Sequence, residues 1–283
     1  MTLPQPSQDA TVAGAMRRSG LAPVDARALM RLVLRANDAF LLAHAGDTLD
    51  DAQRERFQAL AARRREGEPV AYLTGEREFY SLSFKITPAV LIPRPETELL
   101  VDAALSRLPA HGEPRVLDLA TGSGCVAIAI ARHRPRARVT ATDLSPEALA
   151  VARENAAGHQ VRIEFLRSDW FAALSGRQFD LVVANPPYIA LDDPHLDQGD
   201  VRFEPRQALV AGPGGLDGIE ILVKQAPRHL VAGAWLLFEH GHDQGSCARV
   251  LLAAAGYDEV CTLSDLAGHP RVSGGLTPPC HRL

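Results

Sequence analysis

The first quarter of the chain has the apolar spacing of short helices. From Asp25 onward, apolar residues recur at intervals of three and four, as on the buried face of an amphipathic helix. They are Ala26, Leu29, Met30, Val33 and Leu34. A second helix is predicted over residues 51–65, and breaks of glycine and proline divide residues 1–70 into about four short helices with no strand.

After Pro114 the pattern changes to apolar runs with β propensity that alternate with helical segments. Such alternation predicts an α/β fold with a mainly parallel sheet and helices on both faces. Ser145-Pro146 supports it, because a capping hydroxyl followed by proline starts a helix, here over residues 147–157. The predicted strands are residues 115–120, 137–143, 161–167, 179–185 and 234–240.

Three segments are therefore expected along the chain. Residues 1–72 form a helical domain, and residues 91–283 form the α/β domain. Between them, residues 78–86 carry Phe79, Tyr80, Phe84 and Ile86 without helical spacing, which favours a short β-hairpin within a linker over residues 73–90.

Composition and charge narrow the class of protein. No uncharged apolar run approaches the ~20 residues of a membrane helix, and residues 1–10 are polar, unlike a secretory signal. A cytoplasmic protein without a membrane partner is expected. The net charge of −4 gives no overall basic surface, which weighs against nucleic acid as a partner. The thiols Cys125, Cys247, Cys261 and Cys280 lack metal-ligand spacing, so we expect them reduced and no metal site.

A candidate cofactor site follows the first of these strands. The strand ends in a glycine turn, and cofactors bind at the carboxyl ends of strands in open α/β sheets. The glycines alone do not choose the cofactor, because Gly122-x-Gly124-x-x-Ala127 also fits nicotinamide and flavin enzymes. The turn consists of Ala120, Thr121, Gly122, Ser123 and Gly124.

Two further sites suit a nucleoside. Asp143 ends the next strand, 19 residues after Gly124, where a carboxylate can accept hydrogen bonds from ribose hydroxyls; a helix cap is the alternative. Asp169-Trp170 follows the third strand and offers a carboxylate for an exocyclic amine and an indole face for a purine. Core packing of Trp170 is the competing interpretation.

The fourth strand delivers the motif that decides the chemistry, Asn185-Pro186-Pro187-Tyr188. An amide nitrogen is a poor nucleophile because its lone pair is delocalised, and acceptors around its N–H groups can localise and aim that pair. Asn185 and the Pro186 carbonyl can act as these acceptors, while the successive prolines fix the turn. Tyr188 supplies a flat face for the planar substrate group. Methyl transfer to an amide or amine nitrogen is predicted.

Further blocks accompany this motif along nearly the whole chain. They are Gly67-x-Pro69-x-x-Tyr72-Leu73-x-Gly75, Leu91-Ile92-Pro93-Arg94-Pro95-Glu96-Thr97-Glu98, Asp200-Val201-Arg202-Phe203-Glu204-Pro205 and Glu239-His240-Gly241. The combination resembles the amino-methylating class I methyltransferases, and more narrowly the HemK family of release factor glutamine methyltransferases.

The resemblance implies a Rossmann-like class I methyltransferase domain with a seven-stranded, mainly parallel sheet, preceded by a small all-α domain that helps to dock a peptide chain release factor. It implies methylation of the glutamine in a Gly-Gly-Gln tripeptide, with S-adenosyl-L-methionine as donor and S-adenosyl-L-homocysteine as product. The family's cofactor residues correspond to 120–124, Asp143, Trp170 and Asn185, and residues 185–188 also hold the substrate glutamine. Arg94 and Glu96 are expected near the active site. We expect a monomer.

The sequence departs from the family pattern at two places. Ala120 stands where relatives commonly have glycine, and we expect its methyl group to be tolerated. The tail, residues 271–276 followed by Thr277-Pro278-Pro279, predicts a short or distorted final strand because proline cannot join a ladder.

Three other enzymes remain as alternatives. A sister enzyme methylates a glutamine on a large-subunit ribosomal protein, and the blocks at 200–205 and 239–241 favour the release factor branch over it. A DNA adenine amino-methyltransferase shares the catalytic tetrapeptide but needs base flipping and a basic face. A nicotinamide dehydrogenase would use Gly122, Gly124 and Asp143 and leave residues 185–188 without a role.

Overall fold

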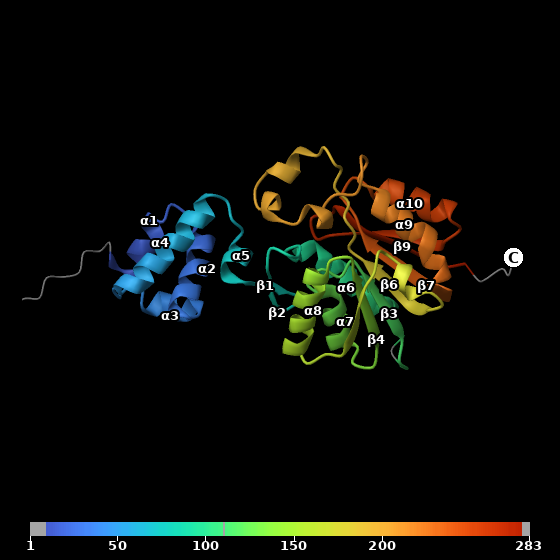
Figure 1. The fold of residues 1–283 in the computed structure, drawn as a ribbon, viewed down its shortest axis with the longest axis horizontal. Helices are drawn as coiled ribbons and strands as arrows, with labels where there is room; N and C mark the ends of the chain where they lie inside the picture. The colour runs from blue at the N-terminus through green and yellow to red at the C-terminus, as the bar shows by residue number, and fades with distance from the viewer. Residues whose placement is uncertain (1–9, 110, 279–283) are drawn as a thin grey trace, which may run out of the picture. The chain divides into compact units, whose positions relative to one another are not determined.

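The computed structural model describes residues 10–109 and 111–278. By its internal contacts the chain divides into two compact units, one ending at Glu76 and the other beginning at Arg77 (Figure 1). This division falls inside the segment 73–90 that the sequence predicts as a linker. Cys280 and Pro279 lie outside the described residues.

The first unit is helical. Its helices are α1 (Val12–Arg18), α2 (Pro23–Leu34), α3 (Asp38–Ala43), α4 (Asp51–Arg65) and α5 (Val70–Thr74). The predicted helix over 51–65 is confirmed residue for residue, and Asp50 caps it by accepting a 2.7 Å hydrogen bond from the Gln53 N–H. The apolar stripe of α2 is buried, with Leu29 and Met30 fully enclosed against Phe57 of α4.

Two short strands open the second unit. They are β1 (Glu76–Phe79) and β2 (Leu82–Lys85), which pair as a separate two-stranded sheet and confirm the predicted hairpin. Phe79 and Phe84 are buried, with ring centroids 6.1 Å apart. Asn155 of α8 (Pro146–Gly158) anchors β2, because its Oδ1 accepts the Lys85 N–H at 2.7 Å.

A seven-stranded sheet forms the centre of the second unit, in the order β5-β4-β3-β6-β7-β9-β8. Strands β3 to β7 pair in parallel, and β9 pairs antiparallel with both β7 and β8. All five predicted strands are present, which confirms the fold class, and β8 is a strand that the apolar pattern does not predict. The strands are β3 (Arg115–Leu119), β4 (Arg138–Asp143), β5 (Ile163–Arg167), β6 (Phe179–Ala184), β7 (Leu230–Glu239), β8 (Asp258–Ser264) and β9 (Pro270–Leu276).

Helices cover both faces of this sheet. Helices α6, α7 and α8 lie on one face and α9 and α10 on the other, as alternating crossovers require (Figure 1). Their bounds are α6 (Glu98–Arg107), α7 (Cys125–His133), α8 (Pro146–Gly158), α9 (Asp217–Gln225) and α10 (Gly245–Ala254). Short 3-10 helices are η2 (Pro95–Thr97), η3 (Ala172–Leu174), η4 (Pro194–Asp197), η5 (Val201–Phe203), η6 (Arg206–Ala208) and η7 (Ala226–Arg228).

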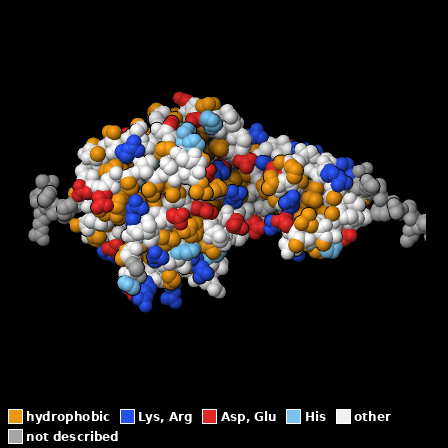
Figure 2. All heavy atoms as spheres, turned by 180° about the vertical axis from the view of Figure 1, so that it is seen from behind, with side chains coloured by type: hydrophobic (Ala, Val, Ile, Leu, Met, Phe, Trp, Pro, Cys, Tyr) orange, Lys and Arg blue, Asp and Glu red, His pale blue; other side chains and the backbone are white. Residues whose placement is uncertain are grey.

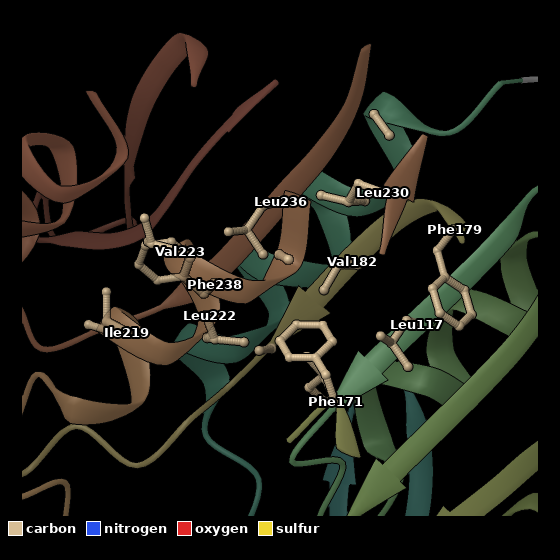
Figure 3. Packing of buried hydrophobic residues seen from close by; sticks show 14 of the residues in the cluster. Leu117, Phe171, Phe179, Val182, Ile219, Leu222, Val223, Leu230, Leu236 and Phe238 are labelled. Atoms are coloured by element: carbon tan, nitrogen blue, oxygen red, sulfur yellow. The ribbon is translucent and has the colours of Figure 1, made fainter. Parts of the chain in front are cut away.

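Strand periodicity assigns each residue of β6 and β7 to a face. Val182 and Ala184 of β6 and Leu236 and Phe238 of β7 belong to the core under α9 and α10 (Figure 3). Residues one position further along each strand therefore point to the opposite face, where α6 lies. This places the side chain that follows Ala184 and the one that follows Phe238 on the side of α6.

The final strand corrects one prediction. Strand β9 is not short and not at an edge, since it has seven residues and lies between β7 and β8. The predicted distortion is present in part, because the register of β9 with β8 shifts at two places. Its pairing ends at Leu276, which is opposite Trp235 of β7 and Asp258 of β8. Pro278 therefore comes after the ladder, where the absence of an N–H costs no hydrogen bond.

Candidate functional site

The sheet register brings the candidate residues to one edge. Leu119 at the end of β3 pairs with Thr142 of β4 and with Ala184 of β6. The next residues along the three strands, Ala120, Asp143 and Asn185, consequently emerge side by side. The strand order reverses between β3 and β6, and such a switch point is where open α/β sheets bind ligands.

The turn after β3 is held by a buried carboxylate. Asp118 is 1% exposed and accepts a 2.6 Å hydrogen bond from the Thr121 hydroxyl. Burial raises the pKa of Asp118 to about 7, against the opposing effect of that hydrogen bond. Ala120 adopts φ +56°, in the left-handed region that favours glycine. The methyl group is accommodated, but this backbone geometry costs roughly 1–2 kcal/mol for an L-residue.

A pocket of about 580 Å³ opens at this edge of the sheet. Its volume lies within the range of small-molecule and cofactor sites. A Cβ atom added to Gly122 would meet no protein atom within 4 Å, so the backbone is open to a ligand there. The predicted site residues that line the pocket are Ala120, Gly122, Asp143, Asp169, Trp170, Asn185 and Pro187.

Asp143 is fixed by backbone donors and still has acceptor capacity. Its Oδ2 accepts the Gly122 N–H and its Oδ1 the Ser145 N–H, each at 2.9 Å. A carboxylate offers about four lone-pair sites, so both oxygens can also accept hydroxyl donors from the pocket. Burial raises the pKa of Asp143. The helix-cap alternative is part of the same geometry, because Asp143 holds the N–H of the residue that caps α8.

The loop after β5 brings Asp169 and Trp170 to the other wall of the pocket. The Ser168 N–H donates to the Asp143 carbonyl at 3.0 Å, which ties this loop to the end of β4. Trp170 is half-buried, with φ +47°, and its carbonyl accepts a 2.7 Å hydrogen bond from the Ser168 hydroxyl. Asp169 is exposed. Trp170 packs on the core and also lines the pocket, so its indole is available to a ligand, and its role beside a purine stays a prediction.

Asn185 has one satisfied and one unsatisfied end. Its Nδ2 donates to the Thr97 hydroxyl at 3.2 Å, whereas its Oδ1 is buried and has no hydrogen-bond partner. A buried acceptor left without a donor costs about 1–3 kcal/mol. Such an atom beside a pocket is what a site needs if it is to receive an N–H from a bound molecule.

Tyr188 is oriented by the carboxylate of Glu239, for which the sequence alone predicts no role. The Tyr188 hydroxyl donates to Glu239 Oε1 at 3.2 Å. Burial raises the pKa of Tyr188 and raises that of Glu239, which is 1% exposed, to about 7. Pro186 is buried, and neither it nor Tyr188 lines the pocket.

The sequence motifs at residues 91–98 and 200–205 contact each other at the rim of the pocket. Glu204 is 4% exposed, its Oε2 accepts the Ile92 N–H at 3.0 Å, and its Oε1 forms an ion pair with Arg94. Leu91 and Pro205, which adjoin these contacts, line the pocket. Arg94 is therefore near the site through this ion pair, which no local sequence pattern indicates.

Three residues of the turn make contacts that support the fold. Thr121 is bonded to Asp118, and the Ser123 carbonyl accepts Asn155 Nδ2 at 2.9 Å. A Cβ on Gly124 would lie 3.1 Å from Ala152 Cβ, so this glycine serves the packing of α7 against α8. A cofactor role for these three positions stays a prediction. Within residues 10–109 and 111–278, no group of three or more His, Cys, Asp or Glu could hold a metal ion, and no helix could span a membrane.

Family profiles and curated relatives identify the family. Residues 12–75 match the profile described as PrmC N-terminal domain, and residues 96–199 match the methyltransferase small domain. A release factor glutamine methyltransferase from Burkholderia pseudomallei is 50% identical over 98% of this chain and 99% of its own. The Xylella fastidiosa (strain Temecula1) protein of that name is 49% identical over 96% and 99%, and the Escherichia coli protein 47% over 89% and 91%.

The chain belongs to the release factor glutamine methyltransferase family. Solved structures agree with the fold of this family: a methyltransferase from Pyrococcus furiosus superposes with a TM-score of 0.54 over 77% of this chain and 97% of its own, at 17% identity. The human Mettl16 catalytic domain gives a TM-score of 0.55 over 79% and 83%, at 16% identity. As a member of the family, the chain is an enzyme that uses S-adenosylmethionine as methyl donor, which confirms the predicted cofactor and reaction class.

The pocket fits the cofactor of this family. The backbone is open at Gly122, a carboxylate with spare acceptor capacity stands at Asp143, and an aromatic face lines the wall at Trp170. An open backbone suits the methionine part of S-adenosylmethionine, a carboxylate acceptor suits its ribose, and an aromatic face suits its purine. The nicotinamide alternative is excluded by membership of a methyltransferase family.

Proposed function

We propose that the chain methylates the side-chain amide nitrogen of the glutamine in the Gly-Gly-Gln motif of peptide chain release factors, and so modulates translation termination. The relatives that cover nearly all of the chain are named for this reaction. The observation that carries the proposal is the buried, unpartnered Oδ1 of Asn185 beside the pocket. A primary amide supplies the N–H donor that this oxygen lacks.

In the proposed reaction, Asn185 Oδ1 and the Pro186 carbonyl accept the two N–H groups of the glutamine. The acceptors localise the nitrogen lone pair and orient it, which makes positioning the main catalytic contribution. The Tyr188 ring lies against the planar amide. S-adenosylmethionine supplies an electrophilic methyl group on its sulfonium. The methylated nitrogen is more acidic than the starting amide and loses its extra proton after transfer.

Roles for the other predicted residues follow from their positions. Asp143 accepts the ribose hydroxyls, and Trp170 lies against the adenine, with Asp169 near its exocyclic amine. The turn 120–124 provides the close approach to the backbone. The helical segment, residues 1–72, serves to dock the release factor, while residues 91–283 carry the methyltransferase site and residues 73–90 link the two.

The remaining features of the proposal concern partners and place. We propose action in the cytoplasm, where a release factor takes part in translation, and on protein rather than nucleic acid. On the face shown in Figure 2, acidic and basic side chains are interspersed and form no continuous basic surface. A monomeric state stays a prediction.

Mass spectrometry of defined substrates tests the proposed function. A purified release factor and, separately, the large-subunit ribosomal protein are incubated with the enzyme and S-adenosylmethionine, with Asn185→Ala as the matched inactive enzyme. The proposal predicts one added methyl group on the Gly-Gly-Gln glutamine and none on a release factor in which that glutamine is replaced by alanine. Methylation of the ribosomal protein alone, or of adenine in DNA, would overturn it.

A further inference from the structure

Gln244 immediately precedes α10, and its side-chain amide makes three hydrogen bonds. Its Nε2 donates to the Tyr188 carbonyl at 2.9 Å and to the Gly215 carbonyl at 3.1 Å. Its Oε1 accepts the Gly241 N–H at 2.9 Å. Two carbonyls face one end of the amide and an N–H faces the other, so its orientation is determined. The side chain therefore joins the last residue of the motif at 185–188 to two other loops.

The segment 211–218 lies close against the backbone of this motif. Gly215 is buried with φ +69°, and a Cβ atom added to it would lie 2.5 Å from the Tyr188 carbonyl oxygen. No side chain fits in that space, so glycine lets the two backbones approach. The carbonyls of Tyr188 and Gly215 cannot bond to each other, because each only accepts hydrogen bonds. Gln244 supplies a donor to both and so holds the two backbones together.

The same segment also forms part of the pocket wall. Gly218 lines the pocket near the start of α9. A Cβ atom added to Gly218 would lie 3.1 Å from the Pro187 carbonyl oxygen and 3.1 Å from Trp170 Cη2. One glycine thus lies against both the motif proposed to hold the substrate amide and the indole proposed to contact the adenine. The place of the motif relative to the cofactor pocket depends on how this segment is held.

We propose that Gln244 is a positioning residue for methyl transfer: by bridging the carbonyls of Tyr188 and Gly215 it fixes the end of the motif that holds the substrate amide. This inference rests on the proposed function, in which residues 185–188 bind the glutamine. Gln244 does not line the pocket, and its amide is already bonded at both ends. It therefore acts through the motif and not on the substrate, and a displaced motif would misplace the reacting nitrogen.

Two substitutions of Gln244 separate this role from a merely structural one. At pH 8 the new carboxyl group of Gln244→Glu is mostly ionised. It keeps an acceptor for the Gly241 N–H but presents an acceptor oxygen to two carbonyls. Gln244→Met has a similar length and provides neither donor nor acceptor. If the side chain served only to support Gly241 before α10, Gln244→Glu would behave as wild type.

The proposal predicts that both variants lose transfer rate and keep the cofactor. With saturating S-adenosylmethionine, single-turnover methylation of the release factor should fall by about 10²-fold, the loss expected when a reacting group is misplaced by about 1 Å. The calorimetric affinity for S-adenosylhomocysteine should stay within about threefold of wild type, because Gln244, Tyr188 and Gly215 do not line the pocket.

Gly218→Ala tests the contact between segment and motif without removing a hydrogen bond. The new methyl group would press on Pro187 and Trp170, so both the transfer rate and the affinity for S-adenosylhomocysteine should fall, although alanine is a better helix former than glycine. Gly158→Ala is the matched control, because Gly158 is also helical and its added Cβ would meet nothing within 4 Å in the described chain. It should leave both quantities unchanged.

Fluorine NMR of the enzyme labelled with fluorotyrosine reports on Tyr188 whatever the substrate is. The chain has four tyrosines, and the signal of Tyr188 is assigned by its loss in Tyr188→Phe. Because Gln244 holds the Tyr188 backbone, this signal should shift in Gln244→Glu and Gln244→Met. It should keep its position in Gly158→Ala.

Several results would overturn the inference. A folded Gln244→Glu enzyme with a transfer rate within about threefold of wild type would do so, as would a Tyr188 signal that does not shift. If neither Gln244 variant folds, Gly218→Ala decides, and a wild-type rate there is equally fatal. Failure of the proposed function is recognised separately, because wild type would then leave the glutamine unmodified, and the fluorine spectra alone would decide the role of Gln244.

Discussion

Replacing Asn185 should separate catalysis from stability. In Asn185→Ala the protein loses one neutral hydrogen bond, from Nδ2 to Thr97 at 3.2 Å, which contributes about 0.5–1.5 kcal/mol. The same change removes a buried oxygen without a partner, which costs the native state about 1–3 kcal/mol. The two effects oppose each other, so we expect a free energy of unfolding equal to or slightly above that of wild type.

The catalytic effect of the same change should be large. Without Oδ1, one of the two acceptors proposed to orient the glutamine nitrogen is missing, and the rate of transfer should fall by at least ~10²-fold, equivalent to about 2.7 kcal/mol in the barrier. Differential scanning calorimetry gives the stability, and single-turnover transfer to the release factor gives the rate. The unfolding midpoint should equal that of wild type or lie up to ~4 °C above it, the shift that 1 kcal/mol causes in a domain of this size.

Asn155 provides a matched control. It is 5% exposed and fully bonded, accepting the Lys85 N–H and donating to the carbonyls of Lys85 and Ser123. Asn155→Ala should therefore lower stability by several kcal/mol, since three hydrogen bonds of about 1 kcal/mol each are lost and their partners stay buried. If Asn185→Ala were destabilised as much as Asn155→Ala, or turned over near the wild-type rate, the assignment of Oδ1 as a substrate acceptor would fail.

Three further predictions concern the cofactor site and its support. Asp143→Asn should weaken binding of S-adenosylhomocysteine by roughly 10-fold in calorimetry, because charge-assisted hydrogen bonds are about twice as strong as neutral ones; unchanged affinity would argue against ribose binding there. Gly124→Ala should lower stability to urea by at least ~1 kcal/mol, since φ is +82° and the new Cβ would lie 3.1 Å from Ala152 Cβ; an unaltered midpoint would contradict it. Burial raises the pKa of Glu239 from its ordinary 4.5 to about 7, so between these values the native state keeps a proton that the unfolded chain has released. Stability should therefore fall as pH rises through this window, more steeply in wild type than in Glu239→Gln; parallel curves would refute the assignment.

The parts of the fold that the sequence predicts are those with a local physical signal. Helix α4 has a capping residue at Asp50 and strand β3 is an apolar run that ends in glycines, so both are found from neighbouring residues alone. Strand β8 has no such signal, because its residues are exposed or half-buried at the edge of the sheet and their alternation is weak. The length of β9 depends on partners in β7 and β8 that only the folded sheet supplies.

The candidate site divides in the same way. Asp143 and Asn185 are predictable, because each follows an apolar strand and the carboxyl ends of parallel strands share one edge. The roles within the turn are not visible in the motif: the Thr121 hydroxyl donates to Asp118, and the Ser123 backbone carbonyl accepts Asn155 Nδ2, so both residues support the turn. Glu239 is the last residue of β7 and Asn185 follows the last residue of β6, and their positions beside one another become visible only in the register of β6 with β7.

The unsatisfied atoms of the site explain why the order of strands matters for chemistry. Asn185 Oδ1 and Glu239 Oε2 are both buried without a hydrogen-bond partner, at the ends of adjacent strands. Each lowers stability, and neither would be kept at two neighbouring positions by packing alone. The backbone hydrogen bonds between β6 and β7 hold both residues in place. The stability lost at these two atoms is therefore offset by the hydrophobic core under α9 and α10, and not by contacts in the site. The enzyme can therefore keep an acceptor open for substrate without losing the geometry that aims it.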